Sequence, residues 1–143
     1  MSESATLLVT GGTGYIGSHT IVELLATEGH CGFTKIVIVD NLSNSSLVCL
    51  ERMQQITGKV NDMVVFEELD ICNERGLDEV FLRHAPVKSV IHFAGLKAVG
   101  ESVREPLKYY ENNVGGTVSL VKCMLKHGCK NIVFSSSATL YGE

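Results

Sequence analysis

The sequence has 143 residues, of which 45% are hydrophobic and 20% charged, and its formal net charge at pH 7 is −4. This length suits one domain, and so high an apolar content with so small a net charge excludes an intrinsically disordered chain. A mildly acidic chain without a Lys/Arg cluster is a poor candidate for binding nucleic acid or an anionic membrane. The longest aliphatic run, residues 36–39, is far shorter than the roughly 20 residues of a membrane-spanning helix.

The first residues and the cysteines both favour a cytoplasmic protein. The start, Met1-Ser2-Glu3-Ser4, lacks the basic and then apolar segments of a signal peptide. The five cysteines are scattered and form no C-x-x-C pair, which favours free thiols in a reducing compartment. Cys123, His127 and Cys129 resemble metal ligands, but a fourth ligand at suitable spacing is missing, and no metal site is predicted.

The first half of the chain predicts two strands, each followed by a helix. Leu7–Thr10 is a short apolar run cut off by glycines, and it reads as the first strand. A helix is expected over 16–28, with Gly29 as its stop. Lys35–Val39 has the continuous β-branched character of a strand buried on both faces. A helix over 47–57, closed by Gly58, follows.

The second half continues the alternation. The pattern predicts a strand at 64–69, a helix at 77–83 and a strand at 89–93. Pro106 suits the first turn of a long helix that reaches about Lys126 and ends at His127-Gly128. Gly115-Gly116 interrupts that helix, and a close packing contact is the usual reason for such glycines. A fifth strand is expected at 131–134.

Five strands alternating with helices predict an α/β fold. We expect residues 1–143 to form a single Rossmann-like domain, a doubly wound parallel sheet with helices on both faces. Ligands of such sheets bind at the carboxyl ends of the strands.

A glycine-rich loop joins the first strand to the first helix. It reads as G-x-G-x-x-G through Gly12, Gly14 and Gly17, or as G-x-x-G-x-x-G through Gly11, Gly14 and Gly17. In either case one glycine permits the tight turn, one lets a pyrophosphate approach the backbone, and one lets the helix pack on the strand. The free N–H groups and the helix dipole then favour negative charge.

An acid follows the second strand. Asp40 lies 23 residues after Gly17, near the spacing of about 20 at which a carboxylate accepts hydrogen bonds from an adenosine ribose. A carboxylate there repels a 2′-phosphate, so the sequence predicts that the chain binds NAD in preference to NADP.

Three blocks of sequence carry a family resemblance: Thr10–His19, His92–Val103 and Phe134–Gly142. The chain resembles the extended branch of the short-chain dehydrogenase/reductase family over essentially its whole length. The first block is shared across the branch, whereas the middle block is more typical of its sugar-nucleotide epimerases. The resemblance implies a homodimeric enzyme that interconverts UDP-glucose and UDP-galactose by transient oxidation at sugar C4, with NAD as cofactor.

The resemblance also implies roles for single residues. Gly14, Tyr15 and Ile16 would contact the pyrophosphate, with Gly11 and Gly17 shaping the loop. Ser137 would be catalytic and would hydrogen-bond the sugar oxygen that is oxidised. The remaining cofactor contacts would come from Asp40 and Asn41 at the ribose, Asp70 and Ile71 at the adenine, and Phe93, Ala94, Gly95, Lys97, Asn112 and Ser135.

The sequence departs from the family at the catalytic base. Family members use a Tyr followed four residues later by a Lys, and no tyrosine here has that partner. We therefore expect a truncated chain, lacking the carboxyl-terminal substrate domain and inactive by itself. Two alternatives stay open: another sugar-nucleotide dehydratase or decarboxylase of the same branch, and a noncatalytic NAD-binding module.

Overall fold

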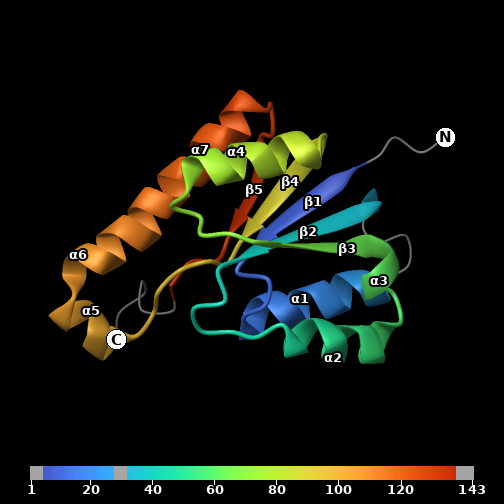
Figure 1. Cartoon of the computed structure of the whole chain (residues 1–143), viewed down its shortest axis with the longest axis horizontal. Helices are drawn as coiled ribbons and strands as arrows, with labels where there is room; N and C mark the ends of the chain where they lie inside the picture. The colour runs from blue at the N-terminus through green and yellow to red at the C-terminus, as the bar shows by residue number, and fades with distance from the viewer. Residues whose placement is uncertain (1–4, 28–31, 138–143) are drawn as a thin grey trace.

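A single parallel sheet forms the centre of the molecule (Figure 1). A computed structural model describes residues 5–27 and 32–137. The sequence expectations for Glu28, Gly29, Cys31 and residues 138–142 lie outside that part. The strand order is β3-β2-β1-β4-β5, and every neighbouring pair is parallel. The strands are β1 (Thr6–Thr10), β2 (Lys35–Asp40), β3 (Val64–Glu68), β4 (Val87–His92) and β5 (Asn131–Phe134).

Strands β1 and β2 are buried on both faces, which explains the apolar runs at 7–9 and 36–39. Because side chains alternate along a strand, Leu7 and Val9 enter one core with Ile36 and Ile38, whereas Leu8 enters the other. Each face of the sheet therefore forms one side of its own hydrophobic core. These two cores hold the helices against the sheet.

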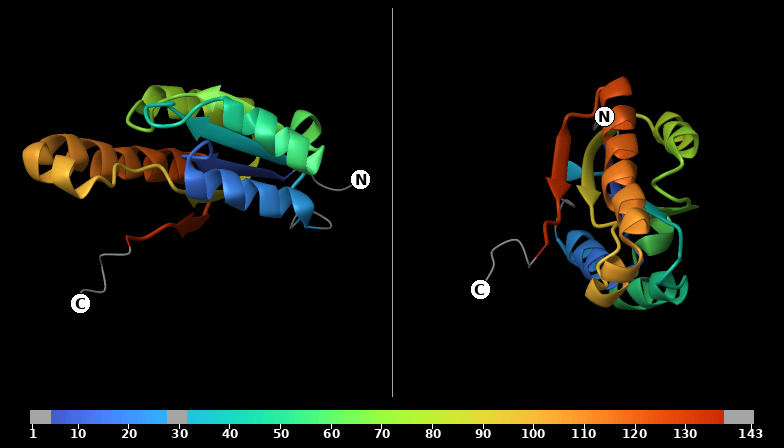
Figure 2. Two further views of the ribbon diagram at one scale, coloured as in Figure 1. Left: turned by 90° about the horizontal axis from the view of Figure 1, so that it is seen from below. Right: turned by 90° about the vertical axis from the view of Figure 1, so that its left-hand side faces the viewer.

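Helices cover both faces of the sheet (Figure 2). One face carries α1 (Tyr15–Ala26), α2 (Val48–Thr57) and the short α3 (Val60–Met63). The other carries α4 (Glu74–Arg83) and α7 (Gly116–Lys126). The segment before α7 consists of α5 (Val99–Arg104), α6 (Pro106–Tyr109) and a π-helix, η2 (Tyr110–Gly115). None of the helices in the described residues has the length and apolar character needed to cross a bilayer.

The five predicted strands and the doubly wound fold class are confirmed, and no strand end differs from its prediction by more than two residues. Gly58 ends α2 in the left-handed conformation, φ 68°, as its position indicates. The helix predicted from residue 77 begins one turn earlier, because the Asn73 side chain caps it by accepting from the Gly76 N–H. The long helix from Pro106 is present but contains the π-helical turn, and α3 and α5 were not predicted.

The packing contact expected at Gly115-Gly116 belongs to Gly116 alone. A Cβ on Gly116 would lie 2.5 Å from Ile71 Cδ1, whereas one on Gly115 would have its nearest neighbour, Tyr110 O, at 4.0 Å. Gly116 therefore lets α7 approach the segment that follows β3.

We expect Gly116→Ala to lower the free energy of unfolding by about 1–3 kcal/mol, because overpacking against Ile71 outweighs the better helix propensity of alanine. Thermal or urea unfolding measures it. Gly115→Ala is the matched control, and it should be neutral or stabilising by up to about 1 kcal/mol. Equal effects of the two substitutions would contradict the packing role.

Candidate dinucleotide site

The parallel arrangement brings the predicted site residues to one edge of the sheet. Thr10 pairs with Val39 on one side and with His92 on the other, and His92 pairs in turn with Phe134. The loops that follow these strand ends therefore lie side by side. β3 ends at the same edge, because Asp40 pairs with Glu68. The predicted site residues lie in these loops, at the end of β2 or in the first turn of α1, except Asn112, which lies in η2.

The loop between β1 and α1 is shaped by its glycines. Gly11 has a φ of +68°, and a Cβ there would lie 2.7 Å from Ala94 N, so the turn passes directly against the end of β4. A Cβ on Gly17 would lie 2.3 Å from Gly11 O, so Gly17 lets α1 pack directly against the turn that follows β1. A Cβ on Gly14 would meet only Gly11 O, at 3.3 Å. Gly14 is thus the position where something other than protein can approach the backbone.

The first turn of α1 is open to solvent. Gly14 is its N-cap residue, in an extended conformation, and no side chain caps the helix. The Tyr15 and Ile16 side chains are 77% and 50% exposed. The first N–H groups of a helix carry partial positive charge and need acceptors. This turn has the geometry of an anion-binding helix N-terminus.

Asp40 joins this loop to the one after β2. Its Oδ2 accepts the Thr13 N–H at 3.1 Å, and its Oδ1 accepts the Leu42 N–H at 3.0 Å and the Ser45 hydroxyl at 3.2 Å. The carboxylate is almost buried, at 8% exposed. Sequence reasoning placed Asp40 at the ribose and missed this bracing role, which spacing along the chain does not reveal.

Asn41 and Asp70 form a second link across the strand ends. The Asn41 amide donates to Asp70 Oδ2 at 2.9 Å, and the Cys72 N–H donates to Asp70 Oδ1 at 2.8 Å. Burial acts to raise the pKa of Asp70, but these hydrogen bonds outweigh it and hold the pKa below its ordinary value. Burial, then the neighbouring Asp70, raises the pKa of the Cys72 thiol to about 11, so that thiol is a poor nucleophile.

Ile71, predicted to lie beside the adenine, has its side chain in the hydrophobic core. Its side chain is 4% exposed and belongs to the core beneath α4 and α7. Only its backbone is left to face a ligand.

The loop after β4 holds the next group of predicted residues. Phe93 and Ala94 are half-buried, whereas Gly95 and Lys97 are exposed. The predicted Asn112 is half-buried and donates to Asn113 Oδ1 at 2.8 Å. Asn113 is the residue that sequence reasoning missed: its side chain pairs with both backbone groups of Leu96.

Ser135 and Ser137 extend from the end of β5, and both are exposed. The Ser135 N–H donates to His92 O at 3.1 Å, which keeps this segment beside β4. His92, expected to be a core residue, is 1% exposed. The structure thus brings both serines to the same edge as the glycine loop.

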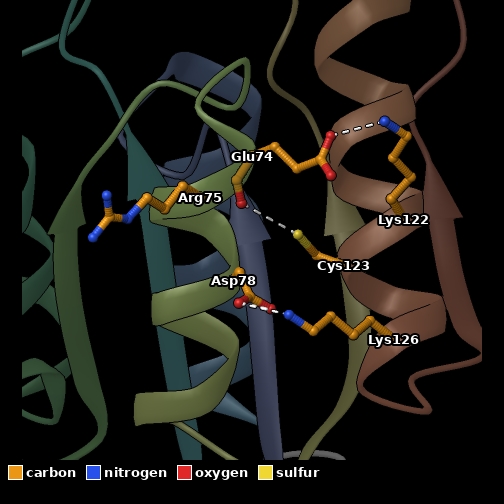
Figure 3. Close-up of a pocket in the computed structure, with 6 residues that line it drawn as sticks. All are labelled: Glu74, Arg75, Asp78, Lys122, Cys123 and Lys126. Atoms are coloured by element: carbon orange, nitrogen blue, oxygen red, sulfur yellow. Dashed lines mark hydrogen bonds and ion pairs between the residues drawn. The ribbon is translucent and has the colours of Figure 1, made fainter.

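A separate hollow lies between α4 and α7 (Figure 3). Its volume is about 410 Å³, and its lining residues are Glu74, Arg75, Asp78, Lys122, Cys123 and Lys126. Figure 3 shows Lys122 and Lys126 directed at Glu74 and Asp78, with which they form ion pairs of 2.9 and 2.8 Å. Both lysines are therefore paired with acids of the hollow, while Arg75 pairs with Glu79 outside it. The hollow shares no residue with the predicted cofactor set.

A metal centre is not indicated in the described part of the chain, where no three His, Cys, Asp or Glu side chains are grouped to hold an ion. His127, one of the residues considered as a ligand, instead contacts Asp78 Oδ1 at 2.7 Å. Cys49, Cys72, Cys123 and Cys129 are free thiols.

Comparison with known proteins gives close relatives. UDP-glucose 4-epimerases from Dictyostelium discoideum and Bacillus subtilis are each 56% identical over 96% and 95% of this chain, respectively. The crystal structure of the Bifidobacterium longum UDP-glucose 4-epimerase, in complex with NAD⁺ and UDP, covers 96% of the chain with a TM-score of 0.85 and 50% identity. The chain spans 37–38% of the length of these relatives.

The sheet order, the glycine loop and the acid at the end of β2 define a Rossmann-like α/β domain of the kind found in dinucleotide-dependent enzymes. The family model described as GDP-mannose 4,6 dehydratase matches residues 8–143, and the chain belongs to that family. The resemblance to its sugar-nucleotide epimerases is confirmed.

Proposed function

We propose that these residues form the NAD-binding part of an enzyme that interconverts UDP-glucose and UDP-galactose. The observation that carries the proposal is the glycine cradle, which leaves Gly14 and the first turn of α1 open beside the carboxylate of Asp40. The epimerase relatives support it, since their sequences match nearly the whole of this chain.

The residues present fit NAD better than NADP. Asp40 is an anion at the ribose position, and no Lys or Arg occurs between Asn41 and Glu51 to accept a 2′-phosphate. Asp40 Oδ2 keeps acceptor capacity beyond its single protein partner, because a carboxylate offers about four lone-pair sites and only three of them are used within the protein. Bound NAD supplies reversible oxidation at C4 of the sugar.

The other residues take roles by position. Tyr15 and Ile16 present N–H groups to the pyrophosphate, which approaches the backbone at Gly14. Asn41, Asp70 and the Ile71 backbone border the adenosine half. The loop after β4 borders the other half of the cofactor, with Lys97 supplying positive charge. Asn112 and Ser135 complete its lining, and Ser137 hydrogen-bonds the sugar oxygen.

The epimerase is favoured over the two alternatives. A dehydratase or decarboxylase of the same family would share the glycine loop, but the block from His92 to Val103 is typical of epimerases. A noncatalytic NAD-binding module would bind dinucleotide in the same way. The greater length of the relatives supports a longer enzyme, in which further residues hold the UDP-sugar. The free thiols support a cytoplasmic setting.

We expect Asp40→Ala to weaken NAD binding by about 1–3 kcal/mol through loss of charge-assisted hydrogen bonds. It should also narrow the preference for NAD over NADP. Calorimetric titration with both dinucleotides measures the change. Ser45→Ala removes one side-chain partner of Asp40 while keeping the carboxylate, and it should leave the NAD affinity within about twofold. If Asp40→Ala bound NAD with unchanged affinity, the assignment of Asp40 to the NAD site would be contradicted.

For the 143 residues by themselves we expect at most weak NAD binding and no epimerase turnover. No Tyr-x-x-x-Lys pair is present, and a general base typically supplies about 10²–10⁴-fold in rate. The assay incubates the chain with UDP-galactose and saturating NAD and measures UDP-glucose, with the Bacillus subtilis relative as positive control. Turnover above a blank without enzyme would mean that another base acts.

A homodimer is part of the proposal. Exposed apolar side chains at helical spacing line one side of the segment from α6 to α7: Leu107, Tyr110, Val114, Val118, Val121 and Leu125. A stripe of this kind marks an interaction surface. We expect Val118→Lys to shift a dimer toward monomer in sedimentation velocity, whereas Ile56→Lys, at an exposed apolar position on α2, should not. A wild-type monomer at all concentrations would contradict the dimer.

A further inference from the structure

A chain of polar contacts runs beneath the loop that follows β4. His92, at the end of β4, places Nδ1 2.6 Å from the Thr10 hydroxyl of β1 and Nε2 2.9 Å from the Thr117 hydroxyl of α7. The Thr117 hydroxyl donates to Asn113 O at 2.6 Å. The Thr10 oxygen also accepts the Ala94 N–H at 3.3 Å. One imidazole therefore bridges three elements.

The protons in this chain have one consistent arrangement. Thr117 has a single hydroxyl proton, which Asn113 O receives, so its oxygen must accept from His92 Nε2–H. Nδ1 then carries a lone pair and accepts from the Thr10 hydroxyl. In the opposite tautomer His92 Nδ1 would carry a proton, and the fully buried Thr10 hydroxyl would lose the acceptor for its own proton. Within the described residues, no other acceptor is hydrogen-bonded to that hydroxyl. The geometry selects the neutral Nε2–H form.

The far end of the chain returns to the same loop. Asn113 Oδ1 accepts the Leu96 N–H at 2.8 Å, and its Nδ2 donates to Leu96 O at 2.9 Å. The Asn112 side-chain amide donates to Asn113 Oδ1, and this hydrogen bond fixes the orientation of the Asn113 side-chain amide. The network thus holds the loop by hydrogen bonds at two residues, Ala94 and Leu96.

We propose that His92, in its neutral Nε2–H form, and Asn113 are positioning residues that hold the loop Phe93–Lys97 in the shape that receives the dinucleotide. The proposal rests on the proposed function, because that loop borders the cofactor. Neither side chain needs to touch NAD. Burial lowers the pKa of His92, and its ring neighbours Thr10, Thr117 and Phe134 carry no charge that would oppose the neutral form.

The first test needs no ligand. Long-range ¹H–¹⁵N correlation on histidine-labelled protein reports which ring nitrogen of His92 is protonated, and we expect Nε2. A protonated Nδ1 or a charged ring would overturn the proposal. Amide exchange gives the second readout: Asn113→Ala should speed exchange of the Leu96 N–H by at least about tenfold. Unchanged exchange would mean that the clamp does not hold the loop.

The binding test uses a matched pair at Thr117. Thr117→Val removes the hydroxyl at nearly constant volume, whereas Thr117→Ser keeps it. We expect Thr117→Val and Asn113→Ala each to weaken NAD binding about tenfold or more, with Thr117→Ser near wild type. If Thr117→Val and Asn113→Ala both bound NAD with wild-type affinity, the positioning role alone would be overturned. Absence of NAD binding by the wild-type protein would instead overturn the proposed function, and the positioning role with it.

Discussion

The pairing of β1 with two neighbours continues past its last residue, and the candidate site depends on it. The Gly11 N–H donates to Val39 O at 2.8 Å, and the Phe93 N–H donates to Thr10 O at 3.0 Å. The glycine loop and the loop after β4 are therefore anchored to the same strand end. The contact of Gly17 with Gly11 O then fixes where α1 begins. A shift of β1 would move all three, so the site has the rigidity of the sheet.

Away from this edge, ion pairs join α4 to α7. Hydrogen bonds from Lys126, then His127, hold the pKa of Asp78 below its ordinary value. The lysine side chains of these ion pairs are largely exposed, so each pair contributes little to the free energy of unfolding. His127 also stacks on Phe81, with ring centroids 5.5 Å apart. Together these contacts hold the carboxyl-terminal half of α7 against α4. The first turn of α7 instead carries Thr117, whose uncharged hydrogen bonds lead toward the candidate site.

The sheet could be predicted because buried parallel strands have uninterrupted apolar runs, as at Ile36–Val39. The glycine loop and Asp40 were predicted from spacing that reflects backbone geometry. Helices α3 and α5 were missed because such short segments bury too few side chains to show a period. The π-helical turn was missed because it depends on hydrogen bonding rather than on the apolar pattern. Asn113 was missed since its partner, Leu96, is distant in sequence and is bonded through its backbone.

Burial of polar groups at the carboxyl end of the sheet argues for a role beyond folding. His92 and Thr10 occupy positions as dry as any in the core, where apolar residues would avoid the cost of desolvation. Each of their polar side-chain atoms has a partner, so that cost is offset only in one arrangement of β1, β4 and α7. At the opposite end of β1, Thr6 is equally buried, yet its hydroxyl has no partner among the described residues. The directed hydrogen bonds thus occur where the loops of the site meet, and they specify the geometry of those loops in a way that apolar packing alone does not.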